Sequence, residues 1–129
     1  MSFQFTRKQR LEQSRDFRRL RSQGQSIAQG CLLANWSIAA ERPTSRLGVV
    51  TSKKIGNAVE RNRARRLLRE AFRLHQQAIA KPIDLVLVAR PSIAGKSRSE
   101  VERDFLSALR KAGLKAASPP AKIQPETTA

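Results

Sequence analysis

Residues 53–72, KKIGNAVERNRARRLLREAF, organise this chain, because they predict a long helix that is apolar on one side only. Asn57, followed three residues later by Glu60, is typical of a helix N-cap with its capping-box partner. At about 3.6 residues per turn, the apolar positions fall on one side of a helix over residues 58–79, and we expect that side to be buried. These positions are Ala64, Leu67, Leu68, Ala71, Phe72, Leu74, Ala78 and Ile79.

The opposite side of the same helix is rich in arginine. It carries Asn62, Arg65, Arg66, Arg69 and Arg73, with Arg63 at its margin. Arginines four residues apart, such as Arg65 and Arg69, repel each other, whereas a solvated face normally mixes charges of both signs. Arg61 lies in the first turn, where the helix dipole disfavours a cation by about 0.3–1 kcal/mol. Because a planar guanidinium suits bidentate contact with phosphate, we interpret this side as a phosphate-binding face.

The composition of the chain indicates a polyanionic partner. Its 129 residues suit one compact domain, and they include 26 Lys and Arg against 10 Asp and Glu, a formal net charge of +16. Such an excess favours RNA, DNA or an anionic membrane as the partner. The chain has 5 Phe, 1 Trp and no Tyr, so a nucleic-acid site must depend on charge more than on stacking.

Local composition also predicts the cellular location and the domain boundaries. The single cysteine, Cys31, cannot form an internal disulfide, which suits a reducing compartment. No segment is long and apolar enough to span a membrane, and the N-terminus lacks the apolar core of a signal peptide. We therefore expect a cytoplasmic protein with one domain over residues 1–114. Residues 115–129, KAASPPAKIQPETTA, have little to bury and are predicted to be disordered.

Three further segments predict strands. Residues 31–40 alternate, and the side that we expect to face the core carries Leu32, Ala34, Trp36 and Ile38. Residues 46–52 follow after a turn, so we expect them to pair with 31–40 as a hairpin. Residues 83–89, IDLVLVA, are apolar on both faces, which favours a central position in the sheet.

Two more helices complete an α+β fold in the order α-β-β-α-β-α. Residues 14–23 predict a short helix with Phe17 and Leu20 on its apolar side. Ser99 and Glu102 are spaced as a capping box that opens the last helix. A single domain with helices packed on a mixed sheet is the economical architecture for this order.

The sequence offers no protein active site, and we assign no catalytic residue. Its acidic residues are scattered, whereas a metal-dependent nuclease usually clusters them. His75, the only histidine, lies on the apolar side of its helix, where a structural role is the simpler interpretation. Cys31 has no activating partner in the sequence, and metal-binding positions stay unassigned.

The stretch over residues 53–72 closely resembles the signature of the bacterial ribonuclease P protein subunit, with the Arg-Asn-Arg core at Arg61, Asn62 and Arg63. The motifs RDF before it, RLGVVTSKK leading into it and DLVLVARP after it agree, and the resemblance covers residues 10–113. It implies an accessory subunit of the tRNA 5′-maturation endoribonuclease, in which an RNA subunit does the chemistry with Mg²⁺. It also implies a left-handed strand–helix–strand crossover, against the usual right-handed rule. The expected partners are the catalytic RNA and precursor tRNA, with no membrane and no protein partner.

The resemblance also implies which residues bind RNA. Those expected at the catalytic RNA are Lys53, Lys54, Asn57, Arg61, Asn62, Arg63, Arg65, Arg66, Arg69 and Arg73. Those expected in a cleft for the single-stranded 5′ leader are Phe17, Arg21, Asn35 and Ser52. The family often has aromatic residues where this chain has Arg21 and Asn35, so leader binding is expected to depend more on charge and hydrogen bonds. Trp36 has the opposite strand parity from Asn35 and is predicted to pack in the core.

Two other classes of function remain as alternatives. A non-catalytic RNA-binding protein of ribosome or RNA assembly has a similar composition, and only the signature favours ribonuclease P over it. Binding to an anionic membrane surface needs an exposed apolar helix face, whereas the apolar stripe here is needed for the core.

Overall fold

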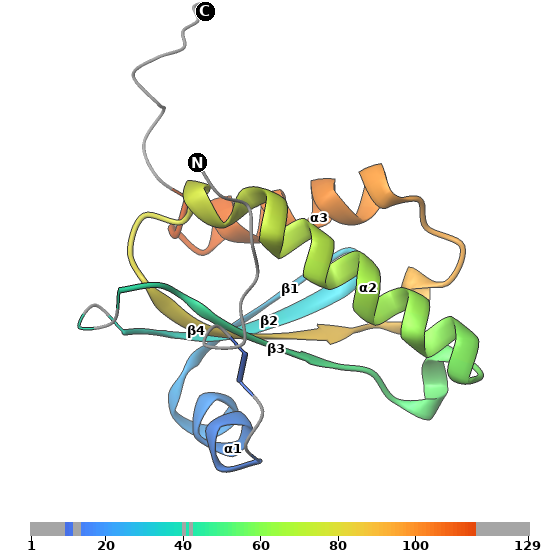
Figure 1. Cartoon of the computed structure of the whole chain (residues 1–129), viewed down its shortest axis with the longest axis horizontal. Helices are drawn as coiled ribbons and strands as arrows, with labels where there is room; N and C mark the ends of the chain where they lie inside the picture. The colour runs from blue at the N-terminus through green and yellow to red at the C-terminus, as the bar shows by residue number, and fades with distance from the viewer. Residues whose placement is uncertain (1–9, 12–13, 40, 42, 116–129) are drawn as a thin grey trace, which may run out of the picture.

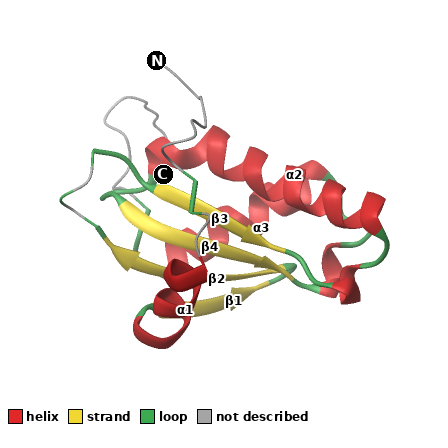
Figure 2. Cartoon of the chain, turned by 60° about the horizontal axis from the view of Figure 1, so that its bottom comes forward, coloured by secondary structure: helices red, strands yellow, loops and turns green. Residues whose placement is uncertain are grey.

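The computed structural model describes residues 10–11, 14–39, 41 and 43–115 as a sheet with helices on both of its faces (Figure 1). The elements are α1 (Ser14–Gln23), β1 (Gln25–Gln29), β2 (Leu32–Ile38), β3 (Arg46–Val50), η2 (Lys53–Ile55), α2 (Ala58–His75), η3 (Gln76–Ala78), β4 (Ile83–Ala89), η4 (Pro91–Ile93) and α3 (Arg98–Lys111). In Figure 1, α2 and α3 cover one face of the sheet and α1 lies on the other. Figure 2 turns the α1 side toward the reader.

The four strands form a mixed sheet in the order β1-β2-β4-β3. Strand β4 is central, as its apolar sequence predicts, and runs antiparallel to β2 and parallel to β3. Helix α2 makes the crossover between the parallel strands β3 and β4. The α+β class and the mixed sheet are therefore confirmed, while the left hand of the crossover stays an implication of the resemblance.

Two predictions about the strands are wrong. The sequence predicts no strand over β1, a short edge strand that pairs with β2 through a tight turn at Gly30, whose φ is 56°. The segment is QSIAQ, so a single Ile provides its β propensity and its pairing partner stabilises it instead. The predicted hairpin between β2 and β3 does not form either, because β4 lies between them.

Element boundaries differ in smaller ways. Helix α2 ends at His75 and continues as the short 3-10 helix η3, so the predicted end at residue 79 is wrong. The capping box of α3 is Ser97 with Glu100, two residues before the predicted pair of Ser99 and Glu102, and both pairs have the same spacing. Strands β2 and β3 are each shorter than predicted.

The main core lies between the sheet and the helices α2 and α3. The predicted stripe of α2 faces it, with Leu68, Ala71 and Phe72 fully buried. Trp36 is also buried there, as its parity predicts. Ile38 is 49% exposed, so its predicted place in the core is wrong, because it ends β2 at the margin of the sheet.

A smaller apolar cluster lies under α1 and is formed by Leu11, Leu20 and Val86. Phe17 packs against it and is partly exposed. Gly48 in β3 permits this packing, because a Cβ atom there would collide with the Phe17 ring. The predicted disordered tail lies outside the described residues except for Lys115, which forms a bridge with Ile79.

Candidate nucleic-acid interface

The start of α2 is fixed by the predicted capping box. The Asn57 side chain accepts a hydrogen bond from the Glu60 backbone N–H (2.9 Å), and Glu60 Oε1 accepts one from the Asn57 N–H (3.0 Å). Gly56 precedes the cap with a φ of 142°, a conformation that side chains rarely adopt. Asn57 therefore has a structural role as N-cap, whether or not it also contacts RNA.

The outer face of α2 gathers the residues that the sequence predicts for it. A shallow hollow of ≈ 380 Å³ is lined by Asn62, Arg65, Arg66, Arg69, Glu70 and Arg73. Glu70 was not part of the prediction, and its Oε1 and Oε2 accept hydrogen bonds from Arg73 NH2 (2.8 Å) and Nε (3.2 Å). These bonds lower the pKa of Glu70. The charge of Arg73 is thus largely balanced within the helix.

Three other predicted arginines donate to groups of the protein itself. Arg61 NH1 donates to the Gly56 carbonyl (2.7 Å), and Arg63 NH2 donates to the Lys96 carbonyl (2.6 Å). Arg65 donates to Thr51 Oγ1 and to Asn62 Oδ1. A guanidinium has five N–H donors, so each of them keeps donors for a phosphate while its orientation is fixed. Sequence reasoning missed these bonds, because three of the four acceptors belong to residues outside α2.

Arg66 and Arg69 are the exposed arginines of this face. Arg66 makes no hydrogen bond or ion pair with any residue that the structure describes. Arg69 extends to the outer edge of β3, where it lines a second hollow of ≈ 340 Å³ together with Arg10 and Phe17. Partial burial, then the charges of Arg10 and Arg65, lower the pKa of Arg69, so an anion there would relieve the crowding of cations.

The predicted lysines extend this surface beyond the helix start. Lys53 and Lys54 are exposed on η2, which connects β3 to α2. Ser52, predicted for the leader cleft, caps η2, and its Oγ accepts a hydrogen bond from the Lys54 N–H (3.3 Å). The cations of η2 and α2 therefore follow one another along the chain on adjoining elements.

The other predicted leader residues lie on the α1 side of the sheet. Phe17 is partly exposed at the inner side of α1, and Arg21, one turn later, is exposed. Asn35 in β2 is only 9% exposed, which leaves little of its side chain for a ligand. The hollow that Phe17 lines together with Arg10 and Arg69 includes neither Asn35 nor Ser52.

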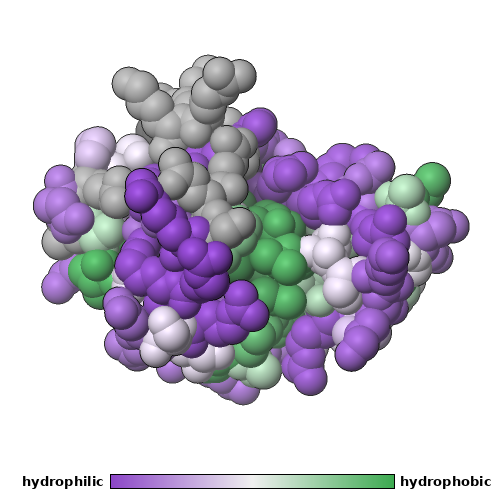
Figure 3. All heavy atoms as spheres, turned by 90° about the horizontal axis from the view of Figure 1, so that it is seen from below, coloured by the Kyte–Doolittle hydropathy of each residue, from purple (hydrophilic) through white to green (hydrophobic). Residues whose placement is uncertain are grey.

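Sequence reasoning missed the apolar floor of this side of the sheet. Leu33, Val88 and Val50 are paired across β2, β4 and β3 in register, and all three are half-buried. Figure 3, seen from the α1 side, shows a hydrophobic strip bordered by hydrophilic residues. On this side Phe17, Val50 and Val88 pack against the small apolar cluster, and Leu33 is the partner of Val88 in β2; we call these four residues the apolar groove. The alternation along each strand carried a signal for it, namely apolar residues on the side away from the main core.

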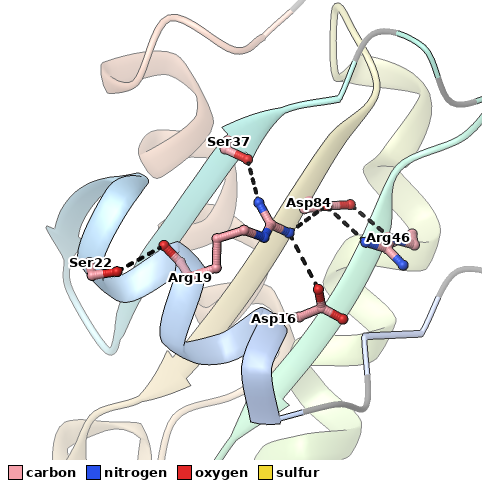
Figure 4. A network of polar contacts seen from close by, with 6 residues as sticks. All are labelled: Asp16, Arg19, Ser22, Ser37, Arg46 and Asp84. Atoms are coloured by element: carbon pink, nitrogen blue, oxygen red, sulfur yellow. Dashed lines mark hydrogen bonds and ion pairs between the residues drawn. The ribbon is translucent and has the colours of Figure 1, made fainter.

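A buried carboxylate holds α1 against the sheet (Figure 4). Asp84 Oδ1 and Oδ2 accept bonds from Arg46 Nε and NH2 (both 2.9 Å), and Oδ2 also accepts one from Arg19 NH2 (3.0 Å). Arg19 further contacts Ser37 Oγ (3.4 Å) and Asp16 (3.5 Å). The hydrogen bonds to Asp84 raise the pKa of Arg46. We call these five residues the Asp84 network, and they fix the helix that carries Phe17.

The only histidine of the chain, His75, contacts an acidic residue of the neighbouring helix. His75 Nε2 lies 3.5 Å from Glu102 Oε1, between α2 and α3. Among the residues that the structure describes, no three His, Cys, Asp or Glu side chains are grouped as a metal site. No described helix is long and apolar enough to cross a membrane.

Comparison with known proteins identifies the family to which this chain belongs. A family model described as Ribonuclease P matches residues 5–113. The chain belongs to the ribonuclease P protein family. The ribonuclease P protein component of Syntrophomonas wolfei subsp. wolfei is 36% identical over 108 residues, which cover 84% of this chain and 90% of that protein. That of Bacillus cereus is 32% identical over 115 residues, covering 89% and 97%.

Solved structures of ribonuclease P proteins have the same fold. The protein from Staphylococcus aureus superposes with a TM-score of 0.76 at 29% identity, covering 84% of this chain and 98% of that one. The protein from Thermotoga maritima gives 0.71 at 28% identity, covering 79% and 96%. This chain is therefore a protein component of ribonuclease P, a tRNA-processing ribonucleoprotein, which implies association with ribonuclease P RNA.

Proposed function

We propose that this chain binds the catalytic RNA through the outer face of α2 and the 5′ leader of precursor tRNA through the apolar groove. In this role it assists the endonucleolytic removal of the leader, which gives the mature 5′ end of the tRNA. The observation that carries the proposal is the outer face of α2, where four arginines line one hollow. The opposite side of that helix is buried in the core, so the arginines are held on a rigid element.

Each part of the surface has its own contribution. Arg66 and Arg69 neutralise phosphates of the folded RNA, which is the main source of affinity in such complexes. Arg61, Arg63 and Arg65, already oriented by protein acceptors, position the RNA relative to the helix. Phe17 offers an aromatic face to a leader base, and the other residues of the apolar groove contact the strand without a requirement for sequence.

The chemistry is assigned to the RNA subunit, as the family resemblance implies, where bound Mg²⁺ would supply an activated water and stabilisation of the developing charge. This chain contributes positive charge that screens phosphate repulsion, so less Mg²⁺ is needed for the folded complex. Cytoplasmic location remains part of the proposal.

Reconstitution with the cognate catalytic RNA tests this function. The protein alone should leave precursor tRNA intact, and with the RNA it should permit cleavage at a lower Mg²⁺ concentration and favour leader-bearing substrate over mature tRNA. An Arg66→Gln/Arg69→Gln variant should lose this stimulation, while an Arg103→Gln/Arg110→Gln variant of α3, with the same loss of charge, should keep it. Robust cleavage by the protein alone would contradict the proposal. No stimulation of the RNA would favour a role in ribosome or RNA assembly.

A further inference from the structure

The outward side of α1 carries arginines that the apolar groove does not use. Successive residues of a helix are offset by about 100°, which sets their order around α1. From the sheet toward solvent, that order is Phe17, Arg21, Arg18 and Arg15. The three arginines are exposed, and together with Arg19 and Ser22 they line a shallow hollow of ≈ 660 Å³. A band of guanidinium groups therefore continues from the ring of Phe17 around the outside of the helix.

This band has no balancing negative charge within the described residues. Arg15, Arg18 and Arg21 form no ion pair there, since Asp16 and Asp84 pair with Arg19 instead. Helix α3 is different, because Arg98 lies 3.8 Å from Glu102 and acidic residues alternate with basic ones along the helix. The face of α3 has the mixture of signs that is typical of a solvated surface, whereas the outward face of α1 does not.

The fold maintains α1 against this repulsion. The helix has 10 residues, fewer than the roughly 12–15 that an isolated helix needs in water. Arg15 with Arg18, and Arg18 with Arg21, are like-charge pairs three residues apart that further oppose its formation. Leu20 and the Asp84 network hold the helix in place, and neither requires arginine on the outward side. A polyanion bound on that side would relieve the repulsion.

The position of the band indicates which polyanion it meets. The catalytic RNA is assigned to α2, on the opposite face of the sheet. Around α1, Arg21, Arg18 and Arg15 follow Phe17 in that order, so a single strand that leaves the apolar groove past Phe17 would meet them in turn. The same strand can therefore occupy the groove and the band without a break.

We propose that Arg15 and Arg18 bind phosphates of the distal 5′ leader, the nucleotides farther from the cleavage site than those in the apolar groove. The inference rests on the proposed leader-binding function and extends the substrate site to the outside of α1. Recognition there is electrostatic and independent of base sequence, because guanidinium groups contact phosphates and α1 itself places no aromatic side chain on that side.

The test compares precursor tRNAs whose leaders are about two and about twelve nucleotides long, below and within the roughly 4–16 nucleotides that single-strand sites span. The holoenzyme is reconstituted with an Arg15→Gln/Arg18→Gln protein, and KM is measured for both substrates at several salt concentrations. We expect KM for the long leader to rise about tenfold, with a log–log salt slope shallower by about 1.4, or 0.7 for each phosphate on a single strand. KM for the short leader should not change.

Matched variants separate this inference from the proposed function. Arg15→Lys/Arg18→Lys should retain most of the long-leader binding, and the α3 control Arg103→Gln/Arg110→Gln should leave both substrates unaffected. Equal effects on long and short leaders, or no effect on either, would overturn the inference. Phe17→Ala serves as the reference for leader binding. If only Phe17→Ala loses leader binding, the proposed function is supported and the role of Arg15 and Arg18 is rejected. If Phe17→Ala also has no effect, the leader-binding function itself fails.

Discussion

The two arginine-rich helices of this protein are held in place in different ways. Helix α2 has 18 residues, a complete capping box and five buried side chains that pack into the main core. Helix α1 has 10 residues, contacts a small apolar cluster and is joined to the sheet through the buried carboxylate of Asp84. Apolar packing therefore positions the proposed site for catalytic RNA, whereas a charge network positions the proposed site for substrate.

This difference makes the two sites sensitive to different changes. On α2, outward arginines can be replaced without disturbing the core, so their effects should appear in RNA affinity and its salt dependence. On α1, the geometry of the apolar groove depends on a few electrostatic contacts that lie beneath the helix. A change to those contacts should therefore weaken substrate binding, although none of the residues that bind the substrate is replaced.

The largest expected effect is that of Asp84→Asn. Removal of the charge leaves Arg46 and Arg19 partly buried without their shared partner, which costs about 3–5 kcal/mol for a buried pair. Denaturant unfolding of the free protein measures the loss. Glu70→Gln is the control, because its pair with Arg73 is more exposed and is expected to contribute at most about 1 kcal/mol. Similar stabilities for the two variants would show that α1 does not depend on the Asp84 network.

The next largest effect is expected for Phe17. Phe17→Ala should weaken the binding of leader-bearing precursor tRNA by about 1–3 kcal/mol, the usual contribution of one stacked base. It should leave the affinity for the catalytic RNA unchanged. Phe17→Leu keeps most of the apolar packing against Gly48 and Leu20, so it separates stacking from stability. Both variants should lose leader binding if the ring stacks on a base. Normal binding by Phe17→Leu would instead assign Phe17 to packing alone.

A comparison of Arg66 with Arg73 tests how the outer face of α2 is used. Arg66 is exposed and makes no bond with the described residues, whereas Arg73 is paired with Glu70. Arg66→Ala should make the log–log salt slope of catalytic-RNA binding shallower by about 0.9, the value for one neutralised phosphate of a duplex, and Arg73→Ala should change it less. An unchanged slope for Arg66→Ala would show that this arginine neutralises no phosphate and is simply part of the solvated surface.

The smallest effect is expected for Glu70→Gln. Its bonds with Arg73 lower the pKa of Glu70, so they stabilise the fold above the unfolded-state pKa near 4.5 and lose this effect as the pH falls through the lower folded-state value. The difference in unfolding free energy between the two proteins should thus be constant at neutral pH and shrink in acid. The variant should also bind RNA slightly more tightly, because Arg73 is released. A difference that grows as the pH falls would contradict this account.

What the sequence predicts well is determined within one segment. The cap, the apolar period and the arginine face of α2 all lie inside residues 57–75, and the structure confirms each of them. The central position of β4 can likewise be predicted from its own segment, because its sequence is apolar on both faces. The hairpin between β2 and β3 failed because the position of β4 decides which strands can be neighbours, and that is a property of the whole sheet.

Contacts between distant segments could not be predicted from the sequence. Arg19 and Asp84 are 65 positions apart, and Arg46 and Asp84 are 38 apart, so no spacing rule connects them. Arg63 likewise donates to a carbonyl 33 residues away. Asp84 and Arg19 looked like an ordinary strand start and an ordinary helix arginine. Their role becomes visible only when β3, β4 and α1 are placed together.

The central claim is that the two faces of the sheet meet different RNAs, and a tethered cleavage reagent tests it most directly. One protein carries Asn62→Cys on α2, the other carries Ser22→Cys on α1, and both positions are exposed. Cys31 needs no replacement, because burial and the neighbouring Asp104 raise the pKa of its thiol to about 12. Each protein is labelled with an iron chelate that cuts nearby RNA and is assembled with catalytic RNA and precursor tRNA. The account predicts cuts in the catalytic RNA from position 62 and cuts in the 5′ leader from position 22. Cuts in the same RNA from both positions would contradict it.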